Sequence, residues 1–435
     1  MKHFDEARRD SEKRLQQILH EDAAIERAVV IEDVFGKIRT AVWLAPDSSP
    51  EFPQRVATEM SDAAGPFWSG ALWVASRQPG ADQEVFERAW REGTEIAPRL
   101  RRVERHRSRG FWLQPPAHPP WSLTDHPDFP ALIAFYSFKG GVGRTTALAS
   151  FALQRARRGE LIVVVDLDLD APGAGTFLGP AEAIAPANWG VVDYLLEQPL
   201  LQHLDLRDYH HRCAGVVADS AGDILVLPAG RLDEEYLGKL ARIDLEPAPA
   251  GQAHPLVELL TDVRAELRPK WILLDCRAGL SEASGFALGG LAHLNVLFGT
   301  SSEQSWLGLR RVIERLGAER VHRNEPQAEC ILVHAMVPPD PETAAIVRDQ
   351  FATRASDEFR YLYYAPDPED PEEEHLWYVR DMESEDAPHM PVAVTYNLAL
   401  ATGRSLELVA ETLVNAPDFQ ALSARIENRF AAEES

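Results

Sequence analysis

The sequence predicts an α/β protein with a mostly parallel, doubly wound sheet that carries helices on both faces, preceded by a small α+β domain. The chain has 435 residues. A single hydrophobic core usually stops growing at about 250–300 residues, so two domains are expected. Beyond residue 130, short continuous runs of Val, Ile and Leu alternate with segments of helical periodicity. This alternation is typical of parallel strands that helices cover on both faces.

A proline-rich segment separates the two predicted domains. Residues 115–130 contain six prolines, and proline disfavours the interiors of helices and sheets and favours an extended backbone. We therefore assign residues 1–114 to the small N-terminal domain, residues 115–130 to a linker and residues 131–435 to the α/β domain.

The N-terminal domain is predicted from a mixture of helical and strand patterns. Two apolar runs are separated by Gly36 and Lys37, which predicts a hairpin. The expected helices span residues 3–20, 51–63 and 82–92, and the expected strands span residues 28–34, 38–45 and 70–76, followed by extended segments within 99–113.

In the second domain the expected strands are short and almost entirely apolar. The first of them, residues 131–138, is followed by a predicted helix at residues 144–158. The further expected strands span residues 161–168, 223–230, 271–276, 294–300, 330–336 and 390–396.

The formal net charge of −24 is unevenly distributed along the chain. Residues 1–125 carry 18 basic and 20 acidic side chains, so nearly the whole acidic excess lies in the second domain. An acidic body repels nucleic acids and anionic lipids in general. The exception is the arginine cluster Arg99–Arg109, followed by Phe111 and Trp112, which fits a nucleic-acid contact, a solvated strand or a surface that docks on the acidic domain. Nucleic acid is not the favoured partner.

The composition indicates a cytoplasmic protein without disulfides. The cysteines Cys213, Cys276 and Cys330 form no CxxC pair, and the charged N-terminus lacks the apolar segment of a secretory signal. No apolar run reaches the roughly 18 residues that a membrane helix requires. The amphipathic stripe in residues 419–430 has acidic as well as basic flanks, so core packing is a better interpretation than membrane binding.

The strongest functional signal is the glycine-rich segment Lys139–Thr146, which reads KGGVGRTT. It follows a predicted strand and opens a predicted helix, which is the context of a phosphate-binding loop. Glycines let successive backbone N–H groups turn towards phosphate oxygens, and the helix N-terminus favours anions. The general pattern GxxxxGK[ST] fails at two positions, because Phe138 replaces its first Gly and Arg144 replaces its Lys.

Carboxylates follow two of the predicted strands. Asp166, Asp168 and Asp170 alternate at the end of one strand, so an extended backbone places them on one face. Asp275 lies near the end of the apolar run WILLDC. Carboxylates seldom end a buried strand unless they meet a cation or a reactive water. We expect such a role for all of them except Asp170, which we interpret as a solvated residue.

The segment Lys139–Thr146 resembles the deviant Walker A sequence, KGGxGK[ST], of the ParA/MinD superfamily of P-loop ATPases, and departs from it only at Arg144. The order of the motifs extends this resemblance over roughly residues 130–430. The resemblance implies a mostly parallel, doubly wound P-loop NTPase sheet, ATP and Mg²⁺ as cofactors, and an ATP-dependent homodimer. The stretch SFKGGVGRT is also similar to a bacterial subgroup of this superfamily that carries the arginine.

The resemblance also implies roles for single residues. Lys139 would reach across the dimer to the phosphates of the other subunit, Arg144 would carry the charge of the usual lysine, and Asp168 would position the attacking water. The expected metal site comprises Thr145, Asp166 and Asp275. The expected nucleotide contacts are Gly140, Gly141, Val142, Gly143, Arg144, Thr145, Thr146, Gly279, Met336 and Pro338.

Three functions remain open on the sequence alone. The favoured one is an ATP-hydrolysing dimerisation switch that recruits a protein partner in its ATP-bound state, with the N-terminal domain as the adaptor. Arg144 is longer than lysine and planar, which favours a non-hydrolysing, nucleotide-gated signalling module, for example in bacterial stress or phage defence. The intact Asp168 favours hydrolysis. A DNA partition ATPase would need a basic surface, which the acidic second domain does not supply.

Overall fold

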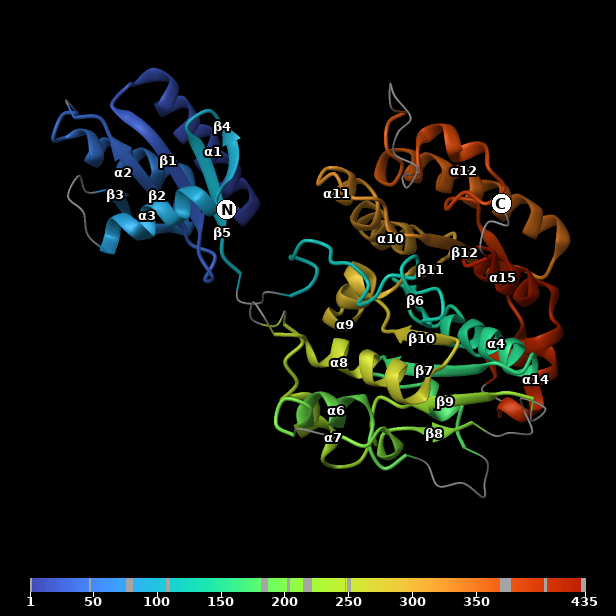
Figure 1. Cartoon of the computed structure of the whole chain (residues 1–435). Coiled ribbons are helices and arrows are strands. Elements are labelled where there is room, and N and C mark those ends of the chain that lie inside the picture. Colours follow the sequence, from blue (N-terminus) through green and yellow to red (C-terminus); the bar gives the residue numbers. More distant parts are fainter. Residues whose placement is uncertain are drawn as a thin grey trace. The chain divides into compact units, whose positions relative to one another are not determined.

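The structure is a computed structural model, and it divides into two compact units, Met1–Arg109 and Gly110–Ser435 (Figure 1). It describes residues 2–431 with the exception of residues 47, 76–80, 107–109, 181–186, 202–203, 214–220, 247, 249–251, 368–376 and 403–404. None of the helices in this described part of the chain is long and apolar enough to span a bilayer.

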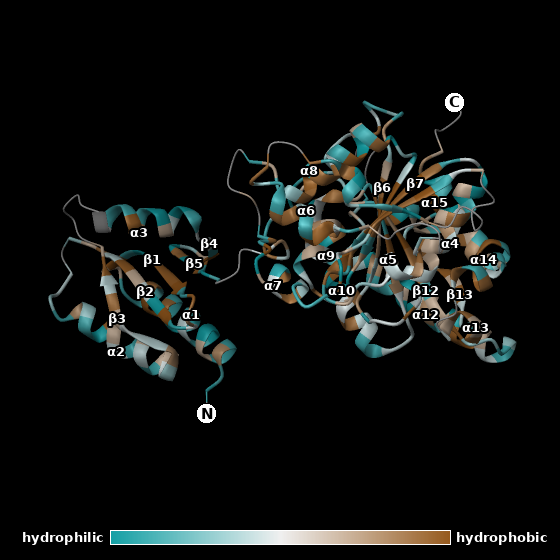
Figure 2. Ribbon diagram, turned by 90° about the horizontal axis from the view of Figure 1, so that it is seen from below, coloured by the Kyte–Doolittle hydropathy of each residue, from teal (hydrophilic) through white to brown (hydrophobic). Residues whose placement is uncertain are grey.

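The first unit is a five-stranded mixed sheet with helices on both faces. The strand order is β3-β2-β1-β5-β4, and β1 pairs antiparallel with β2 but parallel with β5. Helices α1 and α2 bury their apolar stripes against one face, and α3 covers the other (Figure 2). The elements are α1 (Phe4–Glu21), β1 (Ile25–Glu32), β2 (Ile38–Leu44), α2 (Phe52–Ala64), η1 (Gly65–Phe67), β3 (Trp68–Val74), α3 (Ala81–Glu92), β4 (Thr94–Ala97) and β5 (Leu100–Glu104).

The sequence missed one strand of this unit. The expected extended region 99–113 supplies only β5, and its antiparallel neighbour β4 comes before it. The two strands are joined by a tight turn in which Arg99 adopts a left-handed φ of 65°. A non-glycine residue seldom takes this conformation, and the turn signal in the sequence is Pro98, the residue before Arg99.

The second unit has an eight-stranded sheet of order β13-β12-β11-β6-β10-β7-β9-β8. Every neighbouring pair is parallel except β8 with β9. The predicted α/β fold class is therefore confirmed, and the apolar runs form the central strands. The strands are β6 (Ala131–Ser137), β7 (Leu161–Leu167), β8 (His211–Arg212), β9 (Asp223–Leu227), β10 (Trp271–Cys276), β11 (Leu294–Gly299), β12 (Cys330–Val337) and β13 (Val392–Thr395).

Helices cover both faces of this sheet, as a doubly wound fold requires. One face carries α6 (Val191–Glu197), α7 (Tyr236–Leu240), α8 (Pro255–Asp262), α9 (Glu282–Phe286), α10 (Glu303–Leu316) and α12 (Pro341–Leu362). The other carries α4 (Arg144–Arg157), α5 (Ala174–Phe177), α14 (Leu406–Asn415) and α15 (Pro417–Asn428). The remaining short helical segments are η2 (Leu206–Asp208), η3 (Val263–Leu267), η4 (Ala287–Leu291), α11 (Ala318–Val321), η5 (Val379–Glu383) and α13 (Leu398–Ala401).

The C-terminal stripe is part of the core. Phe419, Leu422 and Ile426 of α15 are buried in the same cluster as the apolar residues of α4. The predicted core packing of this stripe is confirmed.

The expected linker lies inside the second unit. Gly110–Pro130, which we call the strap, runs beside α9 and α10 (Figure 1). Trp121 is buried, and its indole Nε1 donates to Pro130 O at 2.8 Å. The six prolines indicated an extended backbone, but the aromatic residues among and before them supply the apolar surface that fixes the segment to the core.

Acid should destabilise the second unit because it holds buried neutral histidines. Burial lowers the pKa of His254 and of His334 to about 4 each. The unfolded chain binds the proton near pH 6.5, so stability is complete above that pH and is lost as the pH falls towards 4. When the pH is lowered from 7 to 5, each histidine should lower the free energy of unfolding by about 2 kcal/mol.

Urea unfolding of the variant His254→Asn tests this expectation. His254 Nδ1 accepts from Leu256 N at 3.0 Å at the start of α8, and asparagine can cap the helix in the same way but does not titrate. The variant should lose about 2 kcal/mol less than the wild type on going from pH 7 to pH 5. Equal losses in the two proteins would contradict the prediction.

Candidate functional site

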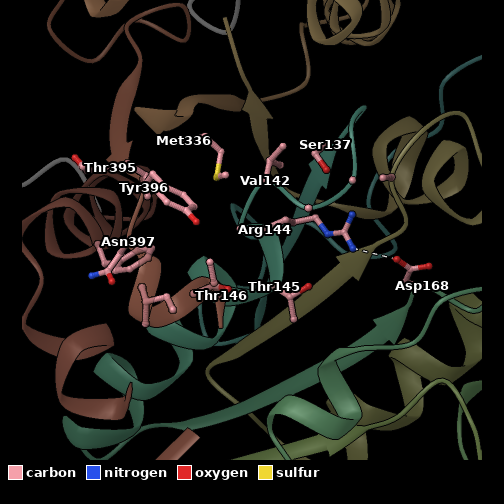
Figure 3. Close-up of a pocket in the computed structure, with 18 of the residues that line it drawn as sticks. Ser137, Val142, Arg144, Thr145, Thr146, Asp168, Met336, Thr395, Tyr396 and Asn397 are labelled. Carbon is pink, nitrogen blue, oxygen red and sulfur yellow. Dashed lines mark hydrogen bonds and ion pairs between the residues drawn. The ribbon is translucent and has the colours of Figure 1, made fainter. Parts of the chain in front are cut away.

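A glycine-rich loop connects β6 to α4 at the carboxyl edge of the larger sheet. Gly141 and Gly143 have φ values of 71° and 85°, a left-handed conformation that glycine adopts without strain. The loop residues Gly140–Thr146 line a cavity of about 640 Å³ (Figure 3). Sequence and structure therefore agree that these residues face one site at a helix N-terminus, where anions are favoured.

Three carboxylates from two neighbouring strands lie near the loop. Asp275 of β10 lies beside Asp166 of β7 in the parallel register, and Asp168 follows β7. Arg144 bridges two of the three: its Nε donates to Asp275 Oδ1 at 2.7 Å and its Nη2 to Asp168 Oδ2 at 3.2 Å (Figure 3). The hydroxyl of Thr145 donates to Asp275 Oδ2 at 2.7 Å.

The side chain of Arg144 thus neutralises a buried acidic cluster. Burial alone would lower the pKa of Arg144, but the charge of Asp275 outweighs it and the pKa is raised. Burial raises the pKa of Asp275 even though Arg144 opposes the shift. Burial, together with the charge of Asp275, raises the pKa of Asp166 to about 7.

Asp166 is held mainly by the backbone that follows it. Its Oδ1 accepts from Asp168 N at 3.1 Å, and its Oδ2 accepts from Gly173 N at 3.1 Å and Gly175 N at 3.3 Å. Asp166 therefore shapes the turn after β7, and Asp168 rather than Asp166 lines the cavity.

The segment after β10 forms a second wall. Arg277 and Ala278 line the cavity, and the N–H of Gly279, with φ of 81°, donates to Ser137 O at 3.2 Å. Arg277 forms an ion pair with Asp170. Asp170 is half-exposed, but it is not merely solvated as we expected.

The third wall was predicted from the sequence only at Met336. Met336, with φ of 60°, and Tyr396 lie across the cavity from Arg144 and Asp168 (Figure 3). The rest of this wall comes from β13 and from the segments after it, and comprises Val394, Thr395, Tyr396, Asn397, Leu400, Ala401 and Phe419. A weak signal existed, because Asn397 Oδ1 accepts from Ala399 N and caps α13, but capping alone does not indicate a binding site.

Lys139 and Pro338 are not among the residues that line the cavity. The side chain of Lys139 is exposed at the start of the loop. The structure thus brings together the loop from Gly140 onward, Asp168 and Met336.

The oxygen ligands near Thr145 fit a magnesium ion. Thr145 lines the cavity, and its hydroxyl oxygen and a carboxylate oxygen of the buried Asp275 are hard oxygen ligands 2.7 Å apart. In the part of the chain that the structure describes, no three acidic, histidine or cysteine side chains converge into a metal cage. Mg²⁺ suits such a site, because it usually keeps water and phosphate oxygens among its ligands.

Comparison with known proteins identifies the family. The model of the CobQ/CobB/MinD/ParA nucleotide-binding domain matches residues 133–416, well over half of the chain. The chain belongs to this family. Its second unit is a ParA/MinD-type nucleotide-binding ATPase domain, and the resemblance inferred from the phosphate loop is confirmed at this level.

Individual relatives are distant or matched over short stretches. An iron–sulfur cluster carrier protein from Pseudomonas fragi is 40% identical over 55 residues, or 13% of this chain and 19% of that protein. The match therefore spans about a fifth of that relative. The three cysteines of this chain are buried and form no disulfide.

The similar solved structures have low sequence identity to this chain. A ParA family ATPase from Chlorobium tepidum TLS is 14% identical with a TM-score of 0.42, over 68% of this chain and 98% of that one. The septum site-determining protein MinD from Pyrococcus horikoshii OT3, complexed with Mg-ADP, is 19% identical with a TM-score of 0.37, over 69% and 99%.

Three of the described arginines of the cluster Arg99–Arg109 are engaged within the first unit, whereas Arg105 is exposed. Arg99 donates to Ile25 O, Arg101 donates to Trp90 O at 2.8 Å, and Arg102 pairs with Glu12. Arg107 and Arg109 lie outside the described residues. These contacts weigh against a nucleic-acid footprint, because they neutralise or occupy the side chains that would contact phosphates.

Proposed function

We propose that the second unit binds Mg-ATP in the cavity and hydrolyses it as a dimerisation switch, whose ATP-bound form recruits a protein partner. The observation that carries this proposal is the position of Arg144. The residue that departs from the usual phosphate-loop sequence is anchored by Asp275 and Asp168 at the edge of the cavity, where phosphate oxygens can compete with Asp168 for its guanidinium.

The backbone of the loop would bind the phosphate chain. The N–H groups of Gly140–Gly143 and the N-terminus of α4 supply donors and a favourable dipole for anions. Thr145 and Asp275 would hold Mg²⁺, which supplies charge compensation on the phosphate oxygens. Asp166 orders the turn that carries Asp168.

Arg144 and Asp168 would then act in sequence. The γ-phosphate oxygens compete with Asp168 for the guanidinium of Arg144, and the phosphate–guanidinium contact stabilises the charge of the transition state. Release from Arg144 leaves Asp168 Oδ2 free to accept a proton from a water, while Oδ1 keeps its bond from Ala171 N at 3.2 Å. Phosphate binding would in this way prepare the residue that positions the nucleophile.

Lys139 would complete the site of a second copy. It is exposed and outside the lining of its own cavity, as expected for a side chain that reaches phosphates across a dimer. The first unit would be the adaptor for the protein partner.

Light scattering combined with a phosphate-release assay tests this function. With ATP and Mg²⁺ the wild type should dimerise and release phosphate. Lys139→Ala should bind nucleotide but remain monomeric, and Asp168→Ala should stay dimeric without turnover. Absence of nucleotide binding by the wild type would overturn the proposal.

A non-hydrolysing signalling module is the second candidate. The observation that favours it is the 3.2 Å bond between Arg144 Nη2 and Asp168 Oδ2, because a carboxylate held in this way does not position water. In that case the wild type should bind ATP and dimerise but release no phosphate.

A further inference from the structure

The strap contacts the wall segment, Arg277–Ser281, which leads away from the cavity. We propose that this contact couples nucleotide binding in the second unit to the first unit, which joins the chain directly before Gly110. The proposal rests on the proposed function and adds the route by which a change of bound nucleotide is transmitted from the site to the rest of the chain.

The wall segment reaches the strap within a few residues. Arg277 and Ala278 line the cavity, while Ser281 O accepts from Trp112 Nε1 at 2.7 Å. Glu282, the first residue of α9, accepts from Phe111 N at 2.7 Å. Only two residues, Gly279 and Leu280, therefore separate a cavity-lining side chain from a direct bond to the strap.

Hydrogen bonds tie α9 to the wall segment. Ser284 Oγ donates to Arg277 O at 2.7 Å, and Ser281 Oγ donates to Ser284 Oγ at 2.8 Å. The side chain of Arg277 pairs with Asp170 on the segment after β7. A phosphate group that draws Arg277 away from Asp170 would pull on the carbonyl that Ser284 binds, and α9 would move with it.

The side chains of α9 and of the strap are tightly packed against each other. The ring of Phe111 stacks on Phe286 with centroids 3.8 Å apart. A Cβ on Gly285 would lie 2.7 Å from Trp112 Nε1, closer than atoms pack without displacement. A shift of α9 must therefore displace Phe111 and Trp112.

Buried arginines hold the strap along its length, but only its start contacts α9 directly. Arg315, only 4% exposed, donates to Phe111 O at 2.5 Å and to Gln114 O at 3.0 Å. Arg320 donates to Ala117 O at 3.1 Å, and Ala117 N donates to Gly289 O at 2.6 Å. A displacement of α9 therefore reaches Phe111 first, through its bond to Glu282, and Phe111 is one residue from the boundary with the first unit.

Hydrogen exchange on the full chain tests the coupling, with binding of a fluorescent ADP analogue measured on the same samples. The amides of Phe111 and Ala117 report on the two ends of this contact. Addition of Mg-ADP or of Mg with a non-hydrolysable ATP analogue should change exchange at Phe111 several-fold and at Ala117 less. The variant Glu282→Ala should lose the change at Phe111.

Reciprocity provides a second readout. If nucleotide acts on the strap, loosening the strap must alter nucleotide affinity by the same factor, and Glu282→Ala should shift the Kd about fivefold or more. Glu303→Ala is the matched control. Like Glu282, Glu303 is the first residue of a helix whose N-cap is a serine, but its side chain pairs with Arg354 and not with the strap. The control should retain the wild-type exchange and Kd.

Each outcome decides the proposal. Nucleotide binding without any change at Phe111, together with a wild-type Kd in Glu282→Ala, overturns the coupling and leaves the proposed function standing. Failure of the wild type to bind nucleotide overturns both. If Glu282→Ala does not fold, Trp112→Phe removes only the bond to Ser281 O and keeps a ring against Gly285, and it should show the same two effects.

Discussion

Replacing Arg144 with methionine should lower the free energy of unfolding of the second unit by about 3–5 kcal/mol at pH 7 and abolish nucleotide binding. The guanidinium is nearly buried and is the group that bonds both Asp275 and Asp168. Methionine retains most of the volume, so the loss comes from the charge. Removing one partner of a buried ion pair leaves an uncompensated carboxylate in a low-dielectric site. Urea unfolding and calorimetric titration with Mg-ADP measure the two effects.

Two further variants separate charge from packing. Arg144→Met combined with Asp275→Asn should recover much of the lost stability, because the second change removes the unpaired charge while Thr145 can still donate to the amide oxygen. Arg144→Lys should be intermediate, since one ammonium cannot span both carboxylates as a planar guanidinium does. A stability of Arg144→Met equal to that of the wild type would show that Arg144 is not what neutralises the cluster.

Magnesium should stabilise Arg144→Met and the wild type to different extents. If Mg²⁺ and Arg144 neutralise the same carboxylates, millimolar Mg²⁺ should stabilise Arg144→Met more than the wild type. Thermal unfolding with and without Mg²⁺, with Ca²⁺ as a comparison ion, measures the difference. An equal response of both proteins would place the metal elsewhere.

The parts of the site that the sequence predicted are those encoded in continuous segments. The loop Lys139–Thr146 and the carboxylates Asp168 and Asp275 lie at the ends of apolar strands, and a parallel sheet brings such ends to one edge. The length and purity of the apolar runs identified the strands, because both faces of the sheet are buried. The expected strand 390–396 is also present as β13.

The parts that the sequence did not predict depend on contacts between distant segments. Tyr396 and Asn397 join the cavity only because β13 pairs with β12 at the edge of the sheet. The strap was interpreted as a linker because proline content reports local conformation. Its fixation depends on Arg315 and Phe286, which lie more than 150 residues away. Local patterns carry no information about such partners.

Phe138 illustrates the same limit at the phosphate loop itself. It stands where the general loop sequence has a glycine, and the sequence alone gave no reason for a large ring there. In the structure, a Cβ on Gly308 of α10 would lie 1.9 Å from Phe138 Cγ. The ring of Phe138 therefore packs directly against the backbone of α10. This contact fixes the position of the residue immediately before Lys139.

Gly308→Ala should for this reason destabilise the protein and weaken nucleotide binding, although alanine is the better helix former. Propensity alone predicts a gain of about 1 kcal/mol, whereas the rigid ring and the helix backbone must separate, which typically costs about 1–3 kcal/mol. Gly238→Ala in α7 is the matched control, because its Cβ would meet only the flexible end of Arg242 at 3.2 Å. Urea unfolding should show opposite signs for the two variants, and only Gly308→Ala should raise the Kd for Mg-ADP. If both variants were stabilising, Phe138 would be free to move, and the loop would be held by its glycines and by Arg144 alone.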